Sequence, residues 1–266
     1  MSVLLHVSDT HFGTEQPPVV AALQRLSERL QPDLLVVSGD VTQRARRRQF
    51  DAARHALGAL HARRRLLLPG NHDIPLFNLV QRLVDPYRGW RRAFGPDLAP
   101  QVDEPDWLVL AVRTTRRWRH VNGQVSRRQI DATACRLRAA RPEQLRIVVT
   151  HQPVQVPRPE ERHNLLRNHE AAVRAWSRAG ADLILGGHIH LPYVLPLTPE
   201  PHPTWVAQAG TAVSSRVRRD APNSVNVIRY ERAARRCRVE RWDCSGGGAA
   251  AEFLPRGSTE LRLRTS

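Results

Sequence analysis

The chain has 266 residues, of which 41 % are hydrophobic and 25 % are charged, so it fits one large domain, or a domain with a tail, around a sizeable core. Its three cysteines show no C-x-x-C spacing, which argues against a disulfide framework and against a thiolate zinc site. The formal charge of +16 comes from arginine alone, but the arginines are scattered along the chain, so nucleic acid is a partner that the sequence allows without favouring.

The first apolar run covers residues 3–8 and ends at a charged residue, Asp9. It lacks the basic segment and the small-residue cleavage site of a secretory signal, so it predicts the first strand of the domain. No apolar run elsewhere approaches the length of a membrane-spanning helix. We therefore expect no membrane segment and a cytoplasmic location.

Strand and helix patterns alternate as far as residue 187. The near-continuous apolar runs are typical of strands that are buried on both faces, and they cover residues 3–8, 33–38, 64–69, 106–112, 145–150 and 181–187. Helical patterns lie between them at residues 19–30, 50–62, 126–140 and 168–180. This alternation predicts an α/β fold with a central, largely parallel sheet.

Some residues of this first part have expected structural roles. His6 lies inside the first strand, and we expect it to be a hydrogen-bonded core residue. Residues 75–95 follow the third strand and are expected to form one wall of a cleft. Their aromatic side chains are more typical of a core than of a base-stacking surface, and they are Phe77, Tyr87, Trp90 and Phe94.

Beyond His190 the helical patterns cease. Short strand-like runs such as "TWVAQAG" and "SVNVIRYE" follow one another, and they predict an antiparallel completion of the core. From Ser245 onward, "SGGGAAAEF" and the residues after it show little core-forming pattern. We therefore expect one domain over residues 1–244 and a flexible C-terminal tail over residues 245–266.

Most of the predicted strands end in residues that bind metal ions or phosphate. In an open α/β sheet, the loops beyond the carboxyl ends of the strands form the binding crevice. Five strand ends therefore direct eight side chains to one edge of the sheet: Asp9, His11, Asp40, Asn71, His72, His151, His188 and His190. Such a convergence predicts a shared site.

The ligand types indicate which metals the site would hold. Two carboxylates, one amide and four or five imidazoles are too many for one tetrahedral zinc ion, but they suit two ions that share a bridging carboxylate. Oxygen and imidazole ligands without thiolate favour manganese, iron or zinc. We therefore expect two divalent or mixed-valence ions. Such a centre lowers the pKa of a bridging water and holds a phosphate group during in-line displacement.

Five motifs occur in one order along the chain: D-x-H from Asp9, G-D at Asp40, G-N-H-D over residues 70–73, the lone His151, and G-H-x-H over residues 187–190. With these motifs the sequence resembles the calcineurin-like metallophosphoesterase superfamily. The resemblance implies a two-sheet sandwich flanked by helices, an α/β/β/α fold. "SDTH", "GDVTQ" and the single-domain length are most similar to the class III cyclic-nucleotide phosphodiesterases. In the protein-phosphatase branch, an aspartate stands where this chain has Gln43.

The resemblance also implies a role for each motif residue. Asp9, His11 and His190 would hold one ion. Asn71, His151 and His188 would hold the other, and Asp40 would bridge the two. His72 would lie outside both ligand sets, as a general acid or hydrogen-bond donor to the leaving oxygen. Asp73 would orient a neighbouring imidazole.

The leading hypothesis is a hydrolase that cleaves a phosphodiester by in-line attack of a hydroxide bridging the two ions. The expected substrate is a small nucleotide, with a cyclic nucleotide such as cAMP as the first candidate. A diester carries one negative charge, so it needs no arginine clamp; no arginine lies inside the motifs, although Arg44 or Arg162 would be in reach to supply one.

Two alternatives remain, a nuclease that uses the same chemistry and a scaffold that belongs to another class of function. The positive charge favours a metal-dependent nuclease. A non-catalytic scaffold is disfavoured, because none of the seven metal positions is missing. A homodimer through pairing of sheet edges stays open.

Overall fold

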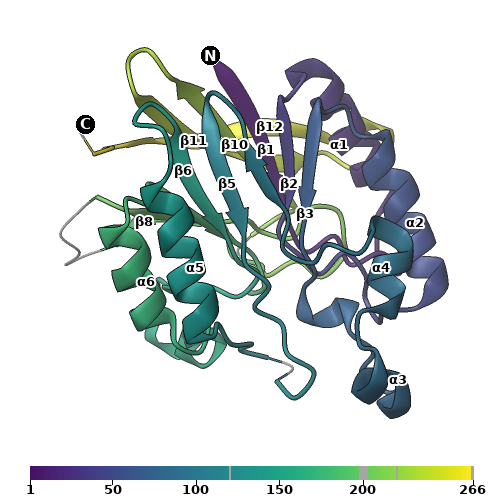
Figure 1. Cartoon of the computed structure of the whole chain (residues 1–266). Coiled ribbons are helices and arrows are strands. Elements are labelled where there is room, and N and C mark those ends of the chain that lie inside the picture. Colours follow the sequence, from purple (N-terminus) through teal and green to yellow (C-terminus); the bar gives the residue numbers. More distant parts are fainter. Residues whose placement is uncertain (120, 198–202, 220, 265–266) are drawn as a thin grey trace.

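The computed structural model of the protein describes residues 1–119, 121–197, 203–219 and 221–264. The strands in these residues form two mixed six-stranded sheets. The sheets lie face to face, and helices cover their outer faces (Figure 1). The predicted two-sheet sandwich flanked by helices is therefore confirmed.

The first sheet joins the beginning of the chain to its end. Three parallel strands form one half, namely β1 (Ser2–Val7), β2 (Leu34–Val37) and β3 (Arg64–Leu67). Antiparallel strands extend the sheet beyond β1, namely β10 (Ser224–Glu231), β11 (Arg236–Ser245) and β12 (Glu252–Leu261). Its outer face is covered by α1 (Pro17–Leu30), α2 (Arg47–Ala59) and α4 (Arg88–Phe94).

The second sheet comes from the middle of the chain. Its four central strands are parallel: β5 (Trp107–Ala111), β6 (Leu145–Val149), β7 (Leu183–Gly186) and β9 (Trp205–Gln208). Its antiparallel edge strands are β4 (Gln101–Asp103) and β8 (Tyr193–Pro196). The helices α5 (Arg127–Arg138) and α6 (His169–Arg178) cover its outer face.

Side chains alternate between two apolar layers along the central strands. On β1, Leu4 faces the layer between the sheets, whereas Leu5 faces the layer beneath α1 and α2. On β6, Ile147 and Val148 divide in the same way between the inner layer and the layer beneath α5 and α6. Because both faces of these strands are buried, their sequences are near-continuous apolar runs.

The end of the chain corrects one prediction. The expected flexible tail is wrong for residues 245–261, because β12 pairs with β11 along its whole length and buries Phe253 and Leu261. This edge strand has little pattern in its sequence. Most of its other side chains are exposed, and it contains Pro255 and Gly257, which an edge strand tolerates better than a central one.

Two further expectations need correction. The segment after His190 is not purely antiparallel, because β9 runs parallel to β7 and pairs with β8 on its other side. In the segment 75–95, Tyr87 and Trp90 are buried as expected, but Phe77 is 77 % exposed. Phe77 precedes the N-cap residue of α3 (Leu79–Val84), a short helix that stands away from both sheets and has no buried residue (Figure 1).

None of the helices in the described ranges is long and apolar enough to cross a membrane.

Candidate metal centre

The carboxyl ends of strands from both sheets meet along one edge of the sandwich. Asp9 and His11 follow β1, and Asp40 follows β2. Asn71 and His72 form the short 3-10 turn η1 (Asn71–Asp73) after β3. From the second sheet come His151, which follows β6, and His188 and His190, which follow β7. The structure therefore brings together all the side chains that the sequence predicted at this edge.

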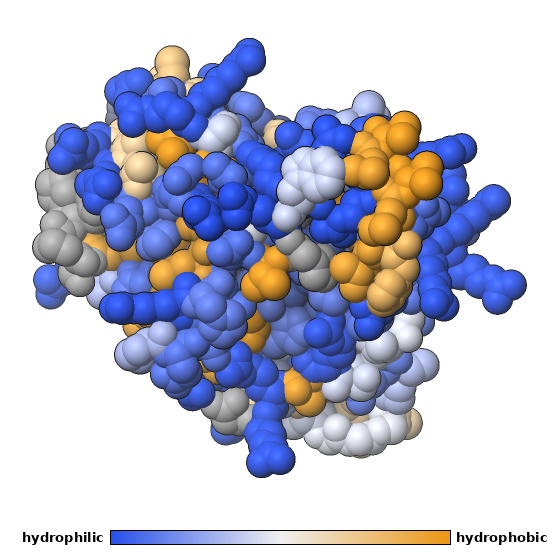
Figure 2. All heavy atoms as spheres, turned by 90° about the horizontal axis from the view of Figure 1, so that it is seen from below, coloured by the Kyte–Doolittle hydropathy of each residue, from blue (hydrophilic) through white to orange (hydrophobic). Residues whose placement is uncertain are grey.

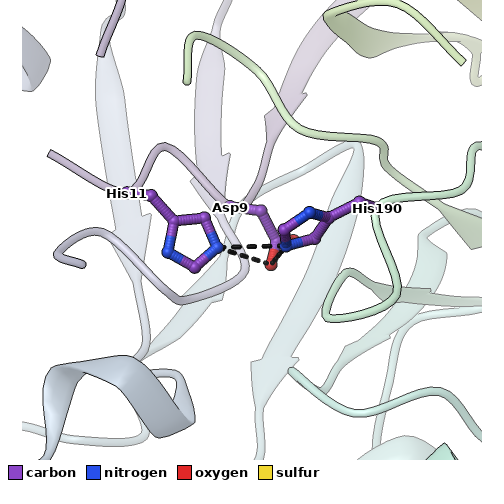
Figure 3. A group of neighbouring side chains, drawn as sticks. All are labelled: Asp9, His11 and His190. Carbon is purple, nitrogen blue, oxygen red and sulfur yellow. Dashed lines mark hydrogen bonds and ion pairs between the residues drawn. The ribbon is translucent and has the colours of Figure 1, made fainter. Parts of the chain in front are cut away.

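One candidate group combines Asp9, His11 and His190, which point toward one another from the two sheets (Figure 3). The Nε2 atoms of His11 and His190 are 3.0 Å apart. They lie 3.6 Å and 3.3 Å, respectively, from Oδ1 of Asp9. Three ligand-type atoms at this spacing can surround one cation, and we call them the first group.

A second group combines Asp40, His151 and His188, whose ligand-type atoms all lie within 4.8 Å of one another. Nε2 of His151 is 3.3 Å from Oδ2 of Asp40 and 3.0 Å from Oδ1 of Asn71. The His151 and His188 rings pack edge to face with their centroids 5.2 Å apart. Asn71 thus adds an amide oxygen to this second group.

Asp40 lies between the two groups. Its Oδ2 is 3.3 Å from Nε2 of His151 in the second group and 3.8 Å from Nε2 of His11 in the first. Its Oδ1 accepts the backbone N–H of His72 at 2.8 Å, which fixes the carboxylate plane. Oδ2 therefore faces both groups, as a bridging ligand requires.

Charge in this buried site is strongly perturbed. Burial favours neutral carboxyls, but His190 beside Asp9, and His151 beside Asp40, outweigh burial and hold both carboxyl pKa values below their usual range. In return, Asp40 overcomes the burial of His151 and raises its pKa to about 9. Burial, reinforced by His151, lowers the pKa of His188 to about 3. The carboxylates thus stay charged and ready to bind cations.

The residues fit metal ions on further grounds. Within the described ranges, Oδ1 of Asp9 and Nδ1 of His188 are buried without a hydrogen-bond partner. Nδ1 of His151 lies 2.8 Å from the Ser38 carbonyl oxygen, and Nδ1 of His190 lies 2.7 Å from that of Arg216. A carbonyl only accepts, so each Nδ1 carries a proton, and Nε2 is the nitrogen that each ring would offer to an ion. Metal-binding histidines are oriented in this way.

The backbone around the site is held in an unusual conformation. Asp9, His11, Asp40, His188 and His190 all have positive φ angles, between 42° and 76°. Such angles cost free energy for residues other than glycine and recur at functional sites. A Cβ atom on Gly70 would lie 2.1 Å from Oδ1 of Asp40, and one on Gly187 would lie 2.3 Å from Oδ2 of Asp9. Both glycines therefore allow a loop to approach a candidate ligand.

His72 lies outside both groups but beside the first. Its ring meets that of His11 edge to face, with the centroids 4.9 Å apart. Its Nδ1 donates to the carbonyl oxygen of Gln43 at 2.9 Å, which orients the ring. The other ring nitrogen, Nε2, lies on the side of the site, 3.4 Å from Nη1 of Arg216.

Asp73 makes its hydrogen bonds with two loops beside the site. Its buried carboxylate accepts the backbone N–H groups of Val41, Thr42 and Gly70, at 2.8–3.1 Å, and the Thr42 hydroxyl. Burial and the charge of Asp40 raise its pKa to about 7. Asp73 thus ties the loop after β2 to the loop after β3, and through those loops it positions Asp40 and Asn71.

Arg216 is a site residue that the sequence did not reveal. Its Nη1 donates to Oε1 of Gln43 at 3.1 Å and lies 3.4 Å from a ring nitrogen of both His72 and His11. Arg216 belongs to the loop after β9, beyond the last motif, and the sequence shows it only as one of many scattered arginines. Of the two arginines considered from sequence, Arg44 stacks on Phe77 and Arg162 is exposed.

A family model described as calcineurin-like phosphoesterase matches residues 2–192. The chain therefore belongs to the calcineurin-like phosphoesterase family. An alignment over 84 residues, which covers 27 % of this chain, shows 40 % identity to the glycerophosphodiester phosphodiesterase GpdQ of Enterobacter lignolyticus (strain SCF1). That match spans only 29 % of the length of the relative.

Solved structures of other proteins show the same fold. The purple acid phosphatase PPD1 from yellow lupin seeds superposes with a TM-score of 0.72 at 10 % identity, over 97 % of this chain and 53 % of that one. A dimetal phosphatase from Danio rerio superposes with a TM-score of 0.67 at 12 % identity, over 99 % of both chains. Together with the family, the two groups of ligand-type residues indicate a dinuclear metal centre.

Proposed function

We propose that the protein is a phosphodiesterase whose two ions, manganese, iron or zinc, are held by the two groups. Asp9, His11 and His190 hold one ion. Asn71, His151 and His188 hold the other, and Asp40 bridges them. The observation that carries this proposal is the placement of Oδ2 of Asp40, which lies within 3.8 Å of a histidine nitrogen in each group.

When bound, two such ions lower the pKa of a water between them and polarise the phosphate oxygens. The residues of the chain supply the rest. His72, oriented by the Gln43 carbonyl, would in its doubly protonated form give the Nε2 proton to the leaving oxygen and keep its Nδ1 proton, a contribution typically worth about 10²–10⁴-fold in rate. Arg216, held by the Gln43 side chain, donates to a non-bridging phosphate oxygen.

The relatives support the preference for a diester over a monoester. The lack of arginine in the motifs does not support it, because an arginine from outside the motifs reaches the site. The motifs contain no arginine, but Arg216 reaches the site from another loop and would also stabilise the second charge of a monoester. Support for a diester comes from the stretch that matches GpdQ, a glycerophosphodiester phosphodiesterase by name, and from the resemblance to class III cyclic-nucleotide phosphodiesterases. A small nucleotide such as cAMP is the first candidate.

The test compares kcat/KM on a bis-aryl and a mono-aryl phosphate with the same leaving group, at fixed Mn²⁺ and salt. We expect the diester to be cleaved faster, and cAMP to be cleaved in the same assay. Preference for the monoester would remove the phosphodiesterase assignment. Faster cleavage of single-stranded DNA, with an affinity that falls steeply as salt rises, would identify a nuclease instead.

A further inference from the structure

An apolar surface stands beside the candidate metal centre. It consists of side chains of α3, of the residue Phe77 before it, and of one tryptophan from another loop; we call it the apolar ridge. Its members are between 43 % and 80 % exposed: Phe77, Leu79, Val80, Leu83, Val84 and Trp118. Figure 2, which views this edge of the molecule from below, shows an orange patch at the position of α3 in Figure 1.

The ridge is one surface although it comes from two segments. Nε of Arg82 on α3 donates to the carbonyl oxygen of Arg117 at 2.6 Å. In return, the guanidinium of Arg117 donates to the carbonyl oxygen of Leu83. These reciprocal bonds hold the loop that carries Trp118 against α3, so the exposed apolar side chains keep a common orientation.

A basic hollow adjoins the ridge. It has a volume of about 680 Å³, and its lining includes Arg91, Arg113, Arg116 and Arg117; we call it the arginine hollow. Asp85 is the one acidic residue of that lining, and it pairs with Arg91. The remaining guanidinium groups stack on aromatic rings or bond to neutral groups, as with Arg113 over Tyr87 at 5.2 Å and Arg117 over Trp118 at 5.7 Å. Their charge therefore remains available to an anion.

We propose that the apolar ridge and the arginine hollow dock this protein on the surface of an anionic lipid bilayer. Exposed apolar side chains on a short helix can enter the boundary between headgroups and acyl chains, while neighbouring arginines bind anionic headgroups. Exposed apolar patches of this kind mark interaction sites. The positive charge beside the patch selects an anionic partner.

A second copy of the chain and nucleic acid fit this surface less well than a bilayer does. In a symmetric dimer, the same patch would lie on both sides of the interface. The arginine hollow of one copy would then lie close to the arginine hollow of the other, and the like charges would repel each other. Nucleic acid would satisfy the arginines, but it would leave the aliphatic side chains of Val80 and Val84, which are 74 % and 80 % exposed, without an apolar partner.

The docking surface lies next to the site. Phe77 follows η1, which carries Asn71 and His72, by only a few residues, and the Arg44 guanidinium stacks on its ring at 5.4 Å. A bilayer held by the ridge would therefore lie close to the entrance of the metal centre. Binding to a bilayer through this surface does not depend on the proposed phosphodiesterase activity.

The experiment is flotation of the full chain with vesicles of phosphatidylcholine alone or mixed with phosphatidylglycerol. We expect binding to the mixed vesicles only, and less of it at high salt. A Phe77→Ser, Val80→Ser, Val84→Ser variant should lose binding. Each of Arg113→Gln and Arg117→Gln should weaken it about fivefold. Leu254→Ser and Arg128→Gln, at exposed positions elsewhere, serve as matched controls that keep binding.

Trp118 supplies a second readout. It is 74 % exposed, whereas Trp90, Trp107 and Trp176 are fully buried. Lipids brominated on their acyl chains should quench its fluorescence, and Trp118→Phe should abolish that quenching. Unchanged melting temperatures and unchanged hydrolysis of a soluble aryl phosphodiester would show that the variants fold and that the site is intact.

Several outcomes would overturn the proposal. One is equal flotation of the ridge variant and the unmodified chain. Another is the absence of flotation, with a dimer in solution that the ridge variant converts to a monomer, which would assign the ridge to a second copy. Binding of single-stranded DNA that the arginine variants abolish, again without flotation, would assign the hollow to nucleic acid.

Discussion

The two ligand groups of the metal centre differ in their share of negative charge. The first group has a carboxylate of its own, Asp9, and in addition shares Asp40. The second has no carboxylate except the shared one, and its additional oxygen donor is the neutral amide of Asn71. Because cation affinity depends strongly on ligand charge, the second group depends on Asp40 more than the first does.

The groups are also linked through the backbone. The N–H of His188, a member of the second group, donates to Oδ2 of Asp9 in the first, at 2.9 Å. Asp9 therefore fixes a loop of the other group as well as belonging to its own group. The two groups are therefore joined through Asp40 and Asp9, and they differ in negative charge.

The largest expected effect comes from Asp40→Ala. This change removes the carboxylate that both groups share, so hydrolysis should be abolished and both metal sites weakened, the second more than the first. Metal content after dialysis, together with activity, checks this. Retention of both ions by the variant would show that Asp40 bridges nothing.

His72→Ala should have the next largest effect. His72 belongs to neither group, so we expect kcat to fall by about 10²–10⁴-fold while metal content stays near that of the unmodified protein. Rate measurements paired with elemental analysis test it, and an aryl ester with a good leaving group, which needs little proton transfer, should be affected less. Loss of a metal from this variant would place His72 among the ligands.

Arg216→Gln should have a moderate effect on substrate binding. The effect should arise beside the first group, where Arg216 lies. Arg216 contacts His11 and His72, so its loss should weaken substrate binding by about tenfold, the value of one charged hydrogen bond. Inhibition by inorganic phosphate should weaken in parallel. Arg219→Gln, a neighbouring exposed arginine, is the matched control. Equal inhibition constants for both variants would exclude contact between Arg216 and phosphate.

The smallest expected effect is on the pH dependence of stability, and it concerns the second group in metal-free protein. Asp40 raises the pKa of His151 to about 9, against an ordinary value of 6.5. The pair therefore stabilises the folded chain fully below pH 6.5, and this stabilisation is lost as pH rises through about 9. A ligand imidazole is neutral, so metal-loaded protein should lack this decline. Melting temperatures of both forms over this range provide the check; equal slopes would contradict His151 as a ligand.

The sequence predicted the first part of the fold better than the last. Strands buried on both faces, such as β1 and β6, carry continuous apolar runs, and the motif residues stand directly at their ends. By contrast, β12 buries little more than Phe253 and Leu261, so its pairing with β11 leaves almost no pattern.

The same contrast applies to the site. Asp9 and His151 were predictable because a strand end determines where they lie. Arg216 was not, because its place depends on how the loop after β9 folds back over the first group. Phe77 was wrongly expected in the core, because an aromatic side chain does not reveal that α3 stands away from both sheets.

The number of ions bound by each chain tests the central claim most directly. Protein prepared without chelator and saturated with Mn²⁺ should contain two ions per chain by elemental analysis, since Oδ2 of Asp40 faces a histidine of each group. A single ion at full occupancy under the same metal-replete conditions would contradict a bridging Asp40, and with it the dinuclear centre.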